Sequence, residues 1–364
     1  MKCAAGPMEQ PPVLPRLSGP VPALNGMRGV AVLLVFFFHA GVPGFGGAFI
    51  GVDIFFILSG FLITALLLQE YQHHSRIHLK QFYLRRILRL FPALLLLLVV
   101  YLVFFFSRFP DPASRLHHLQ DALIALFYAA NWTRAFDLGR PDVLGHCWSL
   151  SIEEQFYALW PMLLLGLLRF PGRRRSFAIL LLFLASWGWR LFLLERGAGW
   201  DRVYNGFDTR ADMLLAGCLL ASLWHDGHLA RWARSRLWSP LLAGASAAAL
   251  ALLAVYGNWQ AAALYRWQYA LVALATTLLI LDLLSRPRGF LSRALSWAPL
   301  AWIGTVSYGI YLWHYPVLHG VALYGLQGAT LVWVVAAVTM AGTLFSWHVV
   351  ERPALRLKAR FSPK

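Results

Sequence analysis

The chain has 364 residues, of which 59% are hydrophobic and only 13% are charged. An ordinary soluble domain carries about 25% charged residues, so this composition argues against a soluble globular enzyme and against a disordered chain. The three cysteines lie far apart and form no CxxC pair, so we expect neither a disulfide framework nor a metal site.

Apolar stretches long enough to cross a bilayer, which takes about 20 residues, recur along the chain. They predict an all-α, polytopic membrane protein with about ten transmembrane helices. The weaker apolar segment 117–132 contains histidines and an aspartate, and we expect it to be interfacial or re-entrant. The expected spans are 28–44, 48–68, 91–106, 150–168, 177–194, 211–224, 239–256, 267–284, 299–319 and 330–349.

The basic residues support this number of spans. If the N-terminus is cytoplasmic, the inner segments carry 23 of the 32 lysines and arginines. This asymmetry is what the positive-inside rule requires, and a spanning 117–132 would invert every later loop. Both termini are therefore expected to be cytoplasmic. The formal net charge of +16 then faces anionic lipid or cytoplasmic anions rather than nucleic acid.

The charge pattern also predicts the domain organisation. Residues 1–20 hold five prolines and no apolar run, which indicates a cytoplasmic tail rather than a signal peptide. Residues 21–353 form the transmembrane domain, and residues 354–364 form a basic cytoplasmic tail. We expect the protein to lie in the inner (cytoplasmic) membrane of a bacterium.

Ionisable residues inside spans are costly and are therefore candidates for function. Arg28 and His39 are eleven residues apart, which places both on one face of a helix, roughly 16 Å apart along its axis. A histidine at this depth suits proton transfer, although it could simply bond a neighbouring helix. Asp53 could orient His39, or it could cap the second span from the outer surface.

The segment HCWSLSIEEQFYALWP opens the fourth expected span. Ser151 and Glu154 have capping-box spacing, which gives Glu154 a structural explanation. Glu153 has none, and it shares a helix face with Ser149, beside Trp148. Glu153 is therefore predicted to be catalytic, and the other two are predicted to contact substrate.

Three further clusters contain candidate binding residues. The arginines in FYLRRILRLFPA could bind phosphate groups or merely attract lipid headgroups. A local ion pair is the structural alternative for the charged pair in TRADMLLAG, and an interfacial aromatic belt is the alternative for SYGIYLWHYP. The candidates are Arg85, Arg86 and Arg89 for the first cluster, Arg210 and Asp212 for the second, and Tyr311 and His314 for the third.

Several of these stretches together resemble acyltransferase family 3, the membrane O-acyltransferases that modify bacterial surface sugars and some secondary metabolites. They occur in the family's order over nearly the whole chain. The matching stretches are LNGMRGVAVLLVFFFHA (24–40), GVDIFFILSGFLIT (51–64), FYLRRILRLFPA (82–93), CWSLSIEEQFYALWP (147–161), TRADMLLAGCLLA (209–221), IGTVSYGIYLWHYP (303–316) and ERP (351–353).

The resemblance implies a ten-span helical fold, an acyl-CoA donor on the cytoplasmic side and an acceptor hydroxyl outside. Some members carry a second, soluble acyl-transfer domain after the membrane part. The sequence stops eleven residues after Pro353, so we expect that domain to be absent. The family's motifs assign catalytic or donor-binding roles to three sets of residues. These are an arginine or lysine followed by ten residues and a histidine, an Arg-x-x-Arg pair, and a Trp-Ser-Leu and glutamate signature. They fall on Arg28 and His39, on Arg86 and Arg89, and on Trp148, Ser149, Leu150 and Glu153.

The resulting hypothesis is acyl transfer from acetyl-CoA to a hydroxyl, with Arg85, Arg86 and Arg89 at the CoA phosphates. His39 would be the general base, oriented by Asp53 or Glu153, or would carry the acyl group itself. The acceptor is expected to be a surface polysaccharide or its lipid-linked precursor, or alternatively a small molecule such as a macrolide. A transporter of glycans, acyl groups or protons is the alternative from another class, but no inverted repeat is visible.

Overall fold

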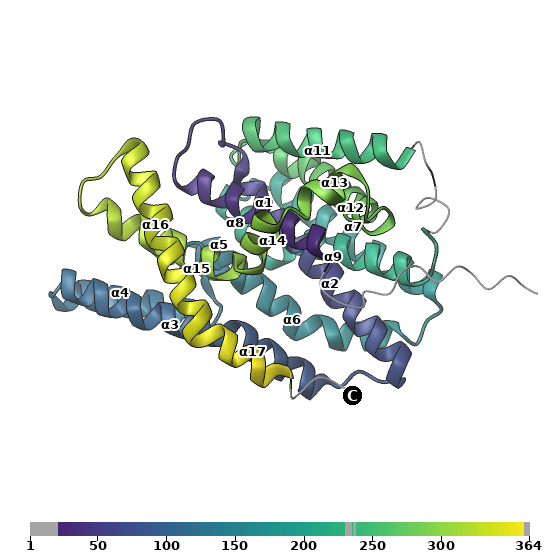
Figure 1. The fold of residues 1–364 in the computed structure, drawn as a ribbon, viewed down its shortest axis with the longest axis horizontal. Helices are drawn as coiled ribbons and strands as arrows, with labels where there is room; N and C mark the ends of the chain where they lie inside the picture. Colours follow the sequence, from purple (N-terminus) through teal and green to yellow (C-terminus); the bar gives the residue numbers. More distant parts are fainter. Residues whose placement is uncertain (1–20, 230–234, 236–237, 360–364) are drawn as a thin grey trace, which may run out of the picture.

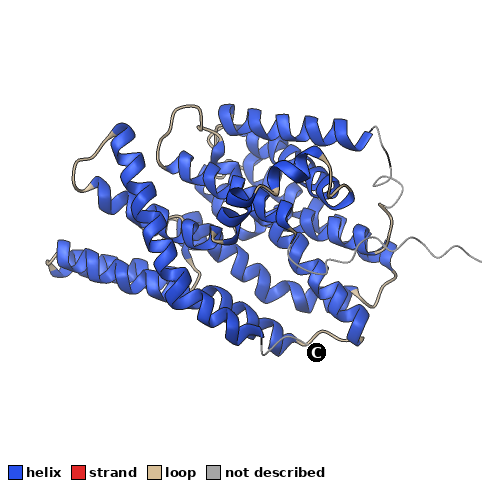
Figure 2. Ribbon diagram, in the orientation of Figure 1, coloured by secondary structure: helices blue, strands red, loops and turns tan. Residues whose placement is uncertain are grey.

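The computed structural model describes residues 21–229, 235 and 238–359, and every regular element in these residues is a helix (Figure 1; Figure 2). The predicted all-α class is thus confirmed for this part of the chain. The helices from the N-terminus to the middle of the chain are α1 Pro22–His39, η1 Ala48–Ile50, α2 Gly51–His74, α3 Leu79–Arg108, α4 Pro112–Leu126, α5 Ala130–Ala135, α6 Cys147–Leu167, α7 Gly172–Glu195, α8 Trp200–Asn205 and α9 Phe207–His225. Those that follow are α11 Trp238–Tyr256, η2 Leu264–Gln268, α12 Tyr269–Ser285, α13 Phe290–Leu295, α14 Ala298–Thr305, α15 Ser307–Ala322, α16 Gly328–Ser346, η3 Trp347–Glu351 and α17 Arg352–Ala359.

Six helical stretches of the described residues are long and apolar enough to cross a membrane. The remaining expected spans also lie on helices, but these are shorter or more polar, so the total of ten and the side of each terminus stay predictions. The six stretches are Pro22–His39, Ala48–His74, Leu79–Arg108, Gly172–Glu195, Leu264–Ser285 and Gly328–Leu357.

Two expected spans have different boundaries in the structure. The third begins at Leu79 instead of residue 91, because α3 continues through Pro92. A proline is tolerated inside such a helix where neighbouring helices compensate for the lost hydrogen bond. The arginine segment therefore belongs to the spanning helix itself. The ninth is broken at the buried Val306, whose backbone leaves the helical region between α14 and α15.

The segment 117–132 is divided between α4 and α5, and neither helix has the length of a span. Asp111 caps α4, since its Oδ1 accepts a hydrogen bond from the Ser114 N–H at 2.8 Å. Helix α4 folds back along α3, where the hydroxyl of Tyr101 and Nδ1 of the buried His118 lie 2.8 Å apart (Figure 1).

Small residues allow a close helix contact between α2 and α9. A Cβ on Gly60 would lie 1.9 Å from the backbone oxygen of Leu214, and one on Gly217 would lie 2.0 Å from that of Ile57. Only glycine permits this approach, as is common where membrane helices pack. The contact holds α2 and α9 in a fixed register beside α6, and this register determines which charged side chains meet.

Candidate active site

A cavity of about 460 Å³ lies between α1, α2, α3, α6 and α15. Its volume falls in the range of small-molecule sites. The wall is largely apolar, and its polar side chains come from segments far apart in the sequence. They are Asn25, Arg28, Ser59, Arg86, Arg89, Ser149, Glu153, Tyr157, Ser307, Tyr308 and Tyr311.

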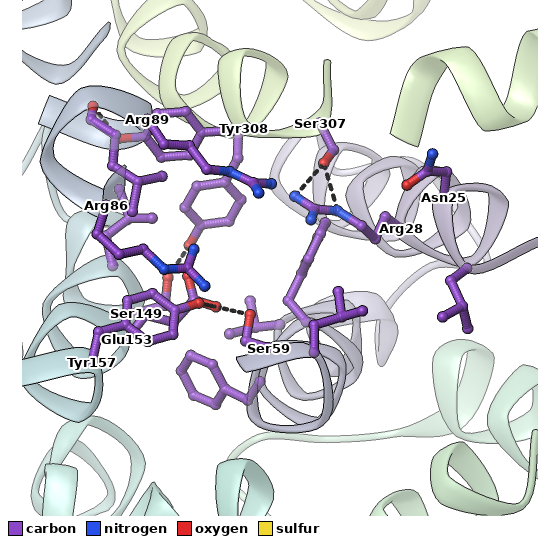
Figure 3. A pocket seen from close by; sticks show the side chains of 18 of the residues that line it. Asn25, Arg28, Ser59, Arg86, Arg89, Ser149, Glu153, Tyr157, Ser307 and Tyr308 are labelled. Carbon is purple, nitrogen blue, oxygen red and sulfur yellow. Dashed lines mark hydrogen bonds between the residues drawn. The ribbon is translucent and has the colours of Figure 1, made fainter. Parts of the chain in front are cut away.

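Three arginines bring their guanidinium groups to this cavity (Figure 3). Arg28 donates to the Ser307 hydroxyl through Nε at 3.4 Å and Nη2 at 3.2 Å. The break between α14 and α15 places Ser307 at the first residue of α15, where it meets α1. Arg86 stacks over the ring of Tyr157, with its central carbon 4.2 Å from the ring centroid. Arg86 and Arg89 project from α3.

Only one carboxylate belongs to the described cavity wall. Glu153 accepts a hydrogen bond from the Ser59 hydroxyl and a second from the Tyr157 hydroxyl at 3.3 Å. Among the described residues, no carboxylate oxygen lies within ion-pair distance of the three cavity arginines. Three cations therefore face one anion, and the cavity has an excess of positive charge.

Arg85 does not line this cavity with Arg86 and Arg89, and its expected contact with the donor stays a prediction. Its Nη2 lies 3.2 Å from Oε2 of Glu70 on α2. Adjacent residues of a helix point about 100° apart, so Arg85 and Arg86 cannot share one face. The i, i+3 spacing brings Arg86 and Arg89 to the same side.

The Ser149 and Tyr311 hydroxyls lie together in the cavity wall. Their oxygens are 2.5 Å apart, and the Tyr311 hydroxyl also donates to the backbone oxygen of His146 at 3.0 Å. Trp148 is absent from the wall; its ring packs 6.1 Å from Phe56, against α2. Of the two expected substrate contacts on α6, only Ser149 therefore reaches the cavity.

His39 lies outside the cavity, beyond Tyr311. Its Nδ1 is 3.0 Å from Nε2 of His314, and the ring of Tyr311 is 5.4 Å from that of His314. The expected contact of His39 with Asp53 or Glu153 does not form. Asp53 is paired with Arg210 of α9, and Glu153 accepts hydrogen bonds from Ser59 of α2 and Tyr157 of its own helix.

Two buried ion pairs connect α9 to its neighbours. Nη2 of Arg210 lies 2.5 Å from Oδ1 of Asp53 on α2, and Nη2 of Arg190 on α7 lies 2.7 Å from Oδ2 of Asp212. All four side chains are almost completely buried. The local pair of Arg210 with Asp212, the structural alternative to a substrate contact, does not form, since residues at i and i+2 of a helix do not face each other. Neither residue lines the cavity, and their expected contact with substrate stays a prediction.

The capping box expected on α6 is also absent. Helix α6 begins at Cys147, so Ser151 lies within its first turns and donates to the Cys147 carbonyl at 2.9 Å. The reason is that the turn at 144–147 already starts the helix. Glu154 consequently has no structural role at a helix start.

Several polar residues at or near the site were not predicted to contact it, among them Asn25 and Tyr308 of the cavity wall. Tyr157 is i+4 from Glu153, a spacing that could have indicated the contact. Nothing in the sequence around Ser59 and Ser307 indicated more than helix packing. His146 precedes the Trp-Ser-Leu signature, and its Nε2 donates to the Leu312 carbonyl at 3.2 Å.

The proline in SYGIYLWHYP explains that last contact. Pro316 lies four residues after Leu312 and has no N–H, so the Leu312 carbonyl lacks its helical partner and can accept from His146. The same turn carries His314, and the histidines of α1, α6 and α15 thereby gather beside Tyr311. Among the described residues, no three His, Cys, Asp or Glu side chains lie close enough together to hold a metal ion.

The fold and the cavity together define a multi-pass membrane protein with an anion-attracting site between its helices. Residues 21–351 match the family model described as an acyltransferase domain. The chain belongs to this family, acyltransferase family 3, as its motifs predicted.

Curated relatives are similar over most of this chain. It is 38% identical to the "Peptidoglycan O-acetyltransferase OatA" of Listeria monocytogenes over 82% of its length and 38% identical to the "Putative peptidoglycan O-acetyltransferase YrhL" of Bacillus subtilis over 92%. Identity to the "O-acetyltransferase OatA" of Staphylococcus aureus is 34% over 92%. The chain spans about half the length of these relatives, 49%, 54% and 57% respectively. No solved structure matches it.

Proposed function

We propose that this protein transfers an acetyl group from acetyl-CoA, bound in the arginine-lined cavity, to a hydroxyl of a cell-surface glycan. The observation that carries the proposal is the excess positive charge of the cavity, where Arg28, Arg86 and Arg89 face a single carboxylate. Unneutralised guanidinium groups inside a helix bundle are costly unless an anionic ligand compensates them.

The phosphates of CoA supply that anion. Guanidinium groups bind phosphate through pairs of parallel hydrogen bonds, and three of them from two helices can contact separate phosphates. The loop charges predict that this end of α1 and α3 faces the cytoplasm, where acetyl-CoA is available. The inner membrane is therefore the proposed location.

His39 is the proposed general base, and it lies eleven residues from Arg28, about 16 Å along α1. The pantetheine arm would extend from the arginines toward Tyr311 and Ser149, which separate the cavity from the histidines. His39 is partly exposed on the other side of this boundary, where an acceptor hydroxyl can approach. Donor and acceptor would then enter from opposite ends.

The names of the relatives support a peptidoglycan-like acceptor. Their printed activity is O-acetylation, and for two of them the named substrate is peptidoglycan. We therefore propose a peptidoglycan fragment or its lipid-linked precursor as the acceptor. A small molecule such as a macrolide remains the alternative acceptor.

The test is a CoA-release assay with the purified chain in detergent. Acetyl-CoA is supplied with peptidoglycan fragments, with a lipid-linked glycan precursor or with a macrolide, and mass spectrometry identifies the acetylated product. We expect release that depends on a glycan acceptor, and we expect His39→Ala to reduce it by about 10²–10⁴-fold. If only the macrolide is acetylated, the acceptor is a small molecule and not a glycan. A wild-type protein that releases no CoA with any acceptor would refute the transferase proposal and favour a transporter.

A further inference from the structure

The two histidines beyond Tyr311 form a chain of ring contacts that ends on a backbone carbonyl. Nδ1 of His314 is 2.7 Å from the Tyr311 carbonyl oxygen, and Nε2 of His314 is 3.0 Å from Nδ1 of His39. His314 is buried, with 2% of its surface exposed, whereas His39 is partly exposed. His314 thus separates His39 from the protein interior.

These contacts determine where the protons lie. A carbonyl oxygen only accepts hydrogen bonds, so Nδ1 of His314 must carry its proton. Nε2 of neutral His314 is then an acceptor, and Nδ1 of His39 must be the donor to it. Neutral His39 consequently has its proton on Nδ1 and a lone pair on Nε2.

No acidic residue competes for this role in the described structure. The titratable rings in contact with the His39 ring are those of Tyr315 and His314 on α15, at 4.8 and 5.1 Å between centroids. The further titratable side chains around it are His319, whose ring packs on Tyr315, Arg134 on α5 and His146 just before α6. None of them is a carboxylate, and Asp53 and Glu153 are engaged elsewhere. The group that orients the histidine of a catalytic pair is often an aspartate, but here another histidine occupies that position.

We propose that His314 is a positioning residue that holds His39 in the tautomer whose Nε2 can accept a proton. The proposal rests on the proposed function, in which His39 is the general base. The acceptor hydroxyl gives its proton to Nε2 of His39 while its oxygen bonds to the thioester carbonyl carbon. The carbon–sulfur bond then breaks, and the proton passes to the leaving thiolate, so the products are the acetyl ester and CoA.

The geometry distinguishes two substitutions of His314. In His314→Gln, the amide oxygen lies near the original Nε2 and can still accept from Nδ1 of His39. In His314→Leu, the side-chain acceptor opposite Nδ1 of His39 is lost, and the backbone of Val35 is the hydrogen-bond partner that the His39 ring keeps. His319→Leu is the matched control, because His319 is on the same helix, with its ring 4.7 Å from that of Tyr315.

The experiment measures kcat and KM for each variant, with melting temperature as the control for folding. We expect His314→Leu to lower kcat by about ten- to a hundred-fold with KM for acetyl-CoA unchanged, because partners that orient a functional histidine contribute on this scale. His314→Gln should keep kcat within about threefold of wild type, and His319→Leu should match wild type.

A fourth variant distinguishes the loss of the hydrogen bond to His39 from a general loss of folding. His314→Asn is polar but one carbon too short to reach His39, so it should lose activity as His314→Leu does. Equal activities of the Gln, Asn and Leu variants would refute the positioning role, as would a loss confined to KM. A wild-type protein without activity would instead refute the proposed function, so the two failures are distinguishable.

Discussion

The buried arginines of α7 and α9 and the arginines of the cavity share a residue type and a helical bundle, but differ in their partners. Arg190 and Arg210 each contact an aspartate of a neighbouring helix, at 2.7 and 2.5 Å. Arg210 also stacks on Tyr269, 4.0 Å from the ring centroid. Their charges are neutralised within the protein, and they hold α2, α7 and α9 together.

The cavity arginines have hydroxyl and aromatic neighbours instead. Arg28 donates to Ser307 and Arg86 stacks on Tyr157, and neither contact cancels a charge. The comparison teaches that the number of charges in a membrane bundle says little about function. The partner of each charge decides whether it serves the fold or remains available for a ligand.

The largest effect should come from breaking a paired arginine. Asp53→Ala leaves Arg210 buried without its anion, which costs about 3–5 kcal/mol. We expect a marked fall in the melting temperature of the detergent-solubilised protein. The double variant Asp53→Ala with Arg210→Met should recover much of the loss, since an apolar pair needs no neutralisation. An unchanged melting temperature in Asp53→Ala would show that this ion pair does not stabilise the fold.

Removing a cavity arginine should affect ligand binding rather than stability. Arg86→Ala or Arg89→Ala should weaken CoA binding by roughly ten- to a hundred-fold, because each charge-assisted hydrogen bond contributes about 1.5–3 kcal/mol. Lysine at either position should restore only part of the CoA affinity, because its ammonium group lacks the planar, two-pronged donor geometry of a guanidinium. Calorimetric titration of CoA measures the effect, and dephospho-CoA reports whether the 3′-phosphate is held. Unchanged dissociation constants in both variants would remove the donor site from this cavity.

The smallest effect should come from Arg85, next in sequence to Arg86 but bonded to Glu70 outside the cavity. Arg85→Ala should leave CoA affinity within about twofold of wild type, because Arg85 lies outside the cavity wall and pairs with Glu70. It is the matched control for Arg86→Ala. If both variants lose CoA binding equally, the general charge of this segment, rather than the cavity, attracts the donor.

The sequence alone determined the helical class, the membrane character and much of the cavity. The number and length of the apolar stretches require helices, because a bilayer leaves no other partner for backbone polar groups. The motifs also singled out Arg86, Arg89 and Glu153 as candidates, and all three side chains lie in the wall of one cavity. These motifs are local, since each depends on residues within a few turns of one another.

Only the tertiary structure decided the partners of the charged and titratable groups. Arg28 meets Ser307, Asp53 meets Arg210 and His39 meets His314, and each pair is separated by more than 150 residues. Helix periodicity shows which face a side chain occupies but not which helix packs against that face. Glycine contacts such as that at Gly60 set the register between helices. This register places Asp53 beside Arg210 and His39 beside His314.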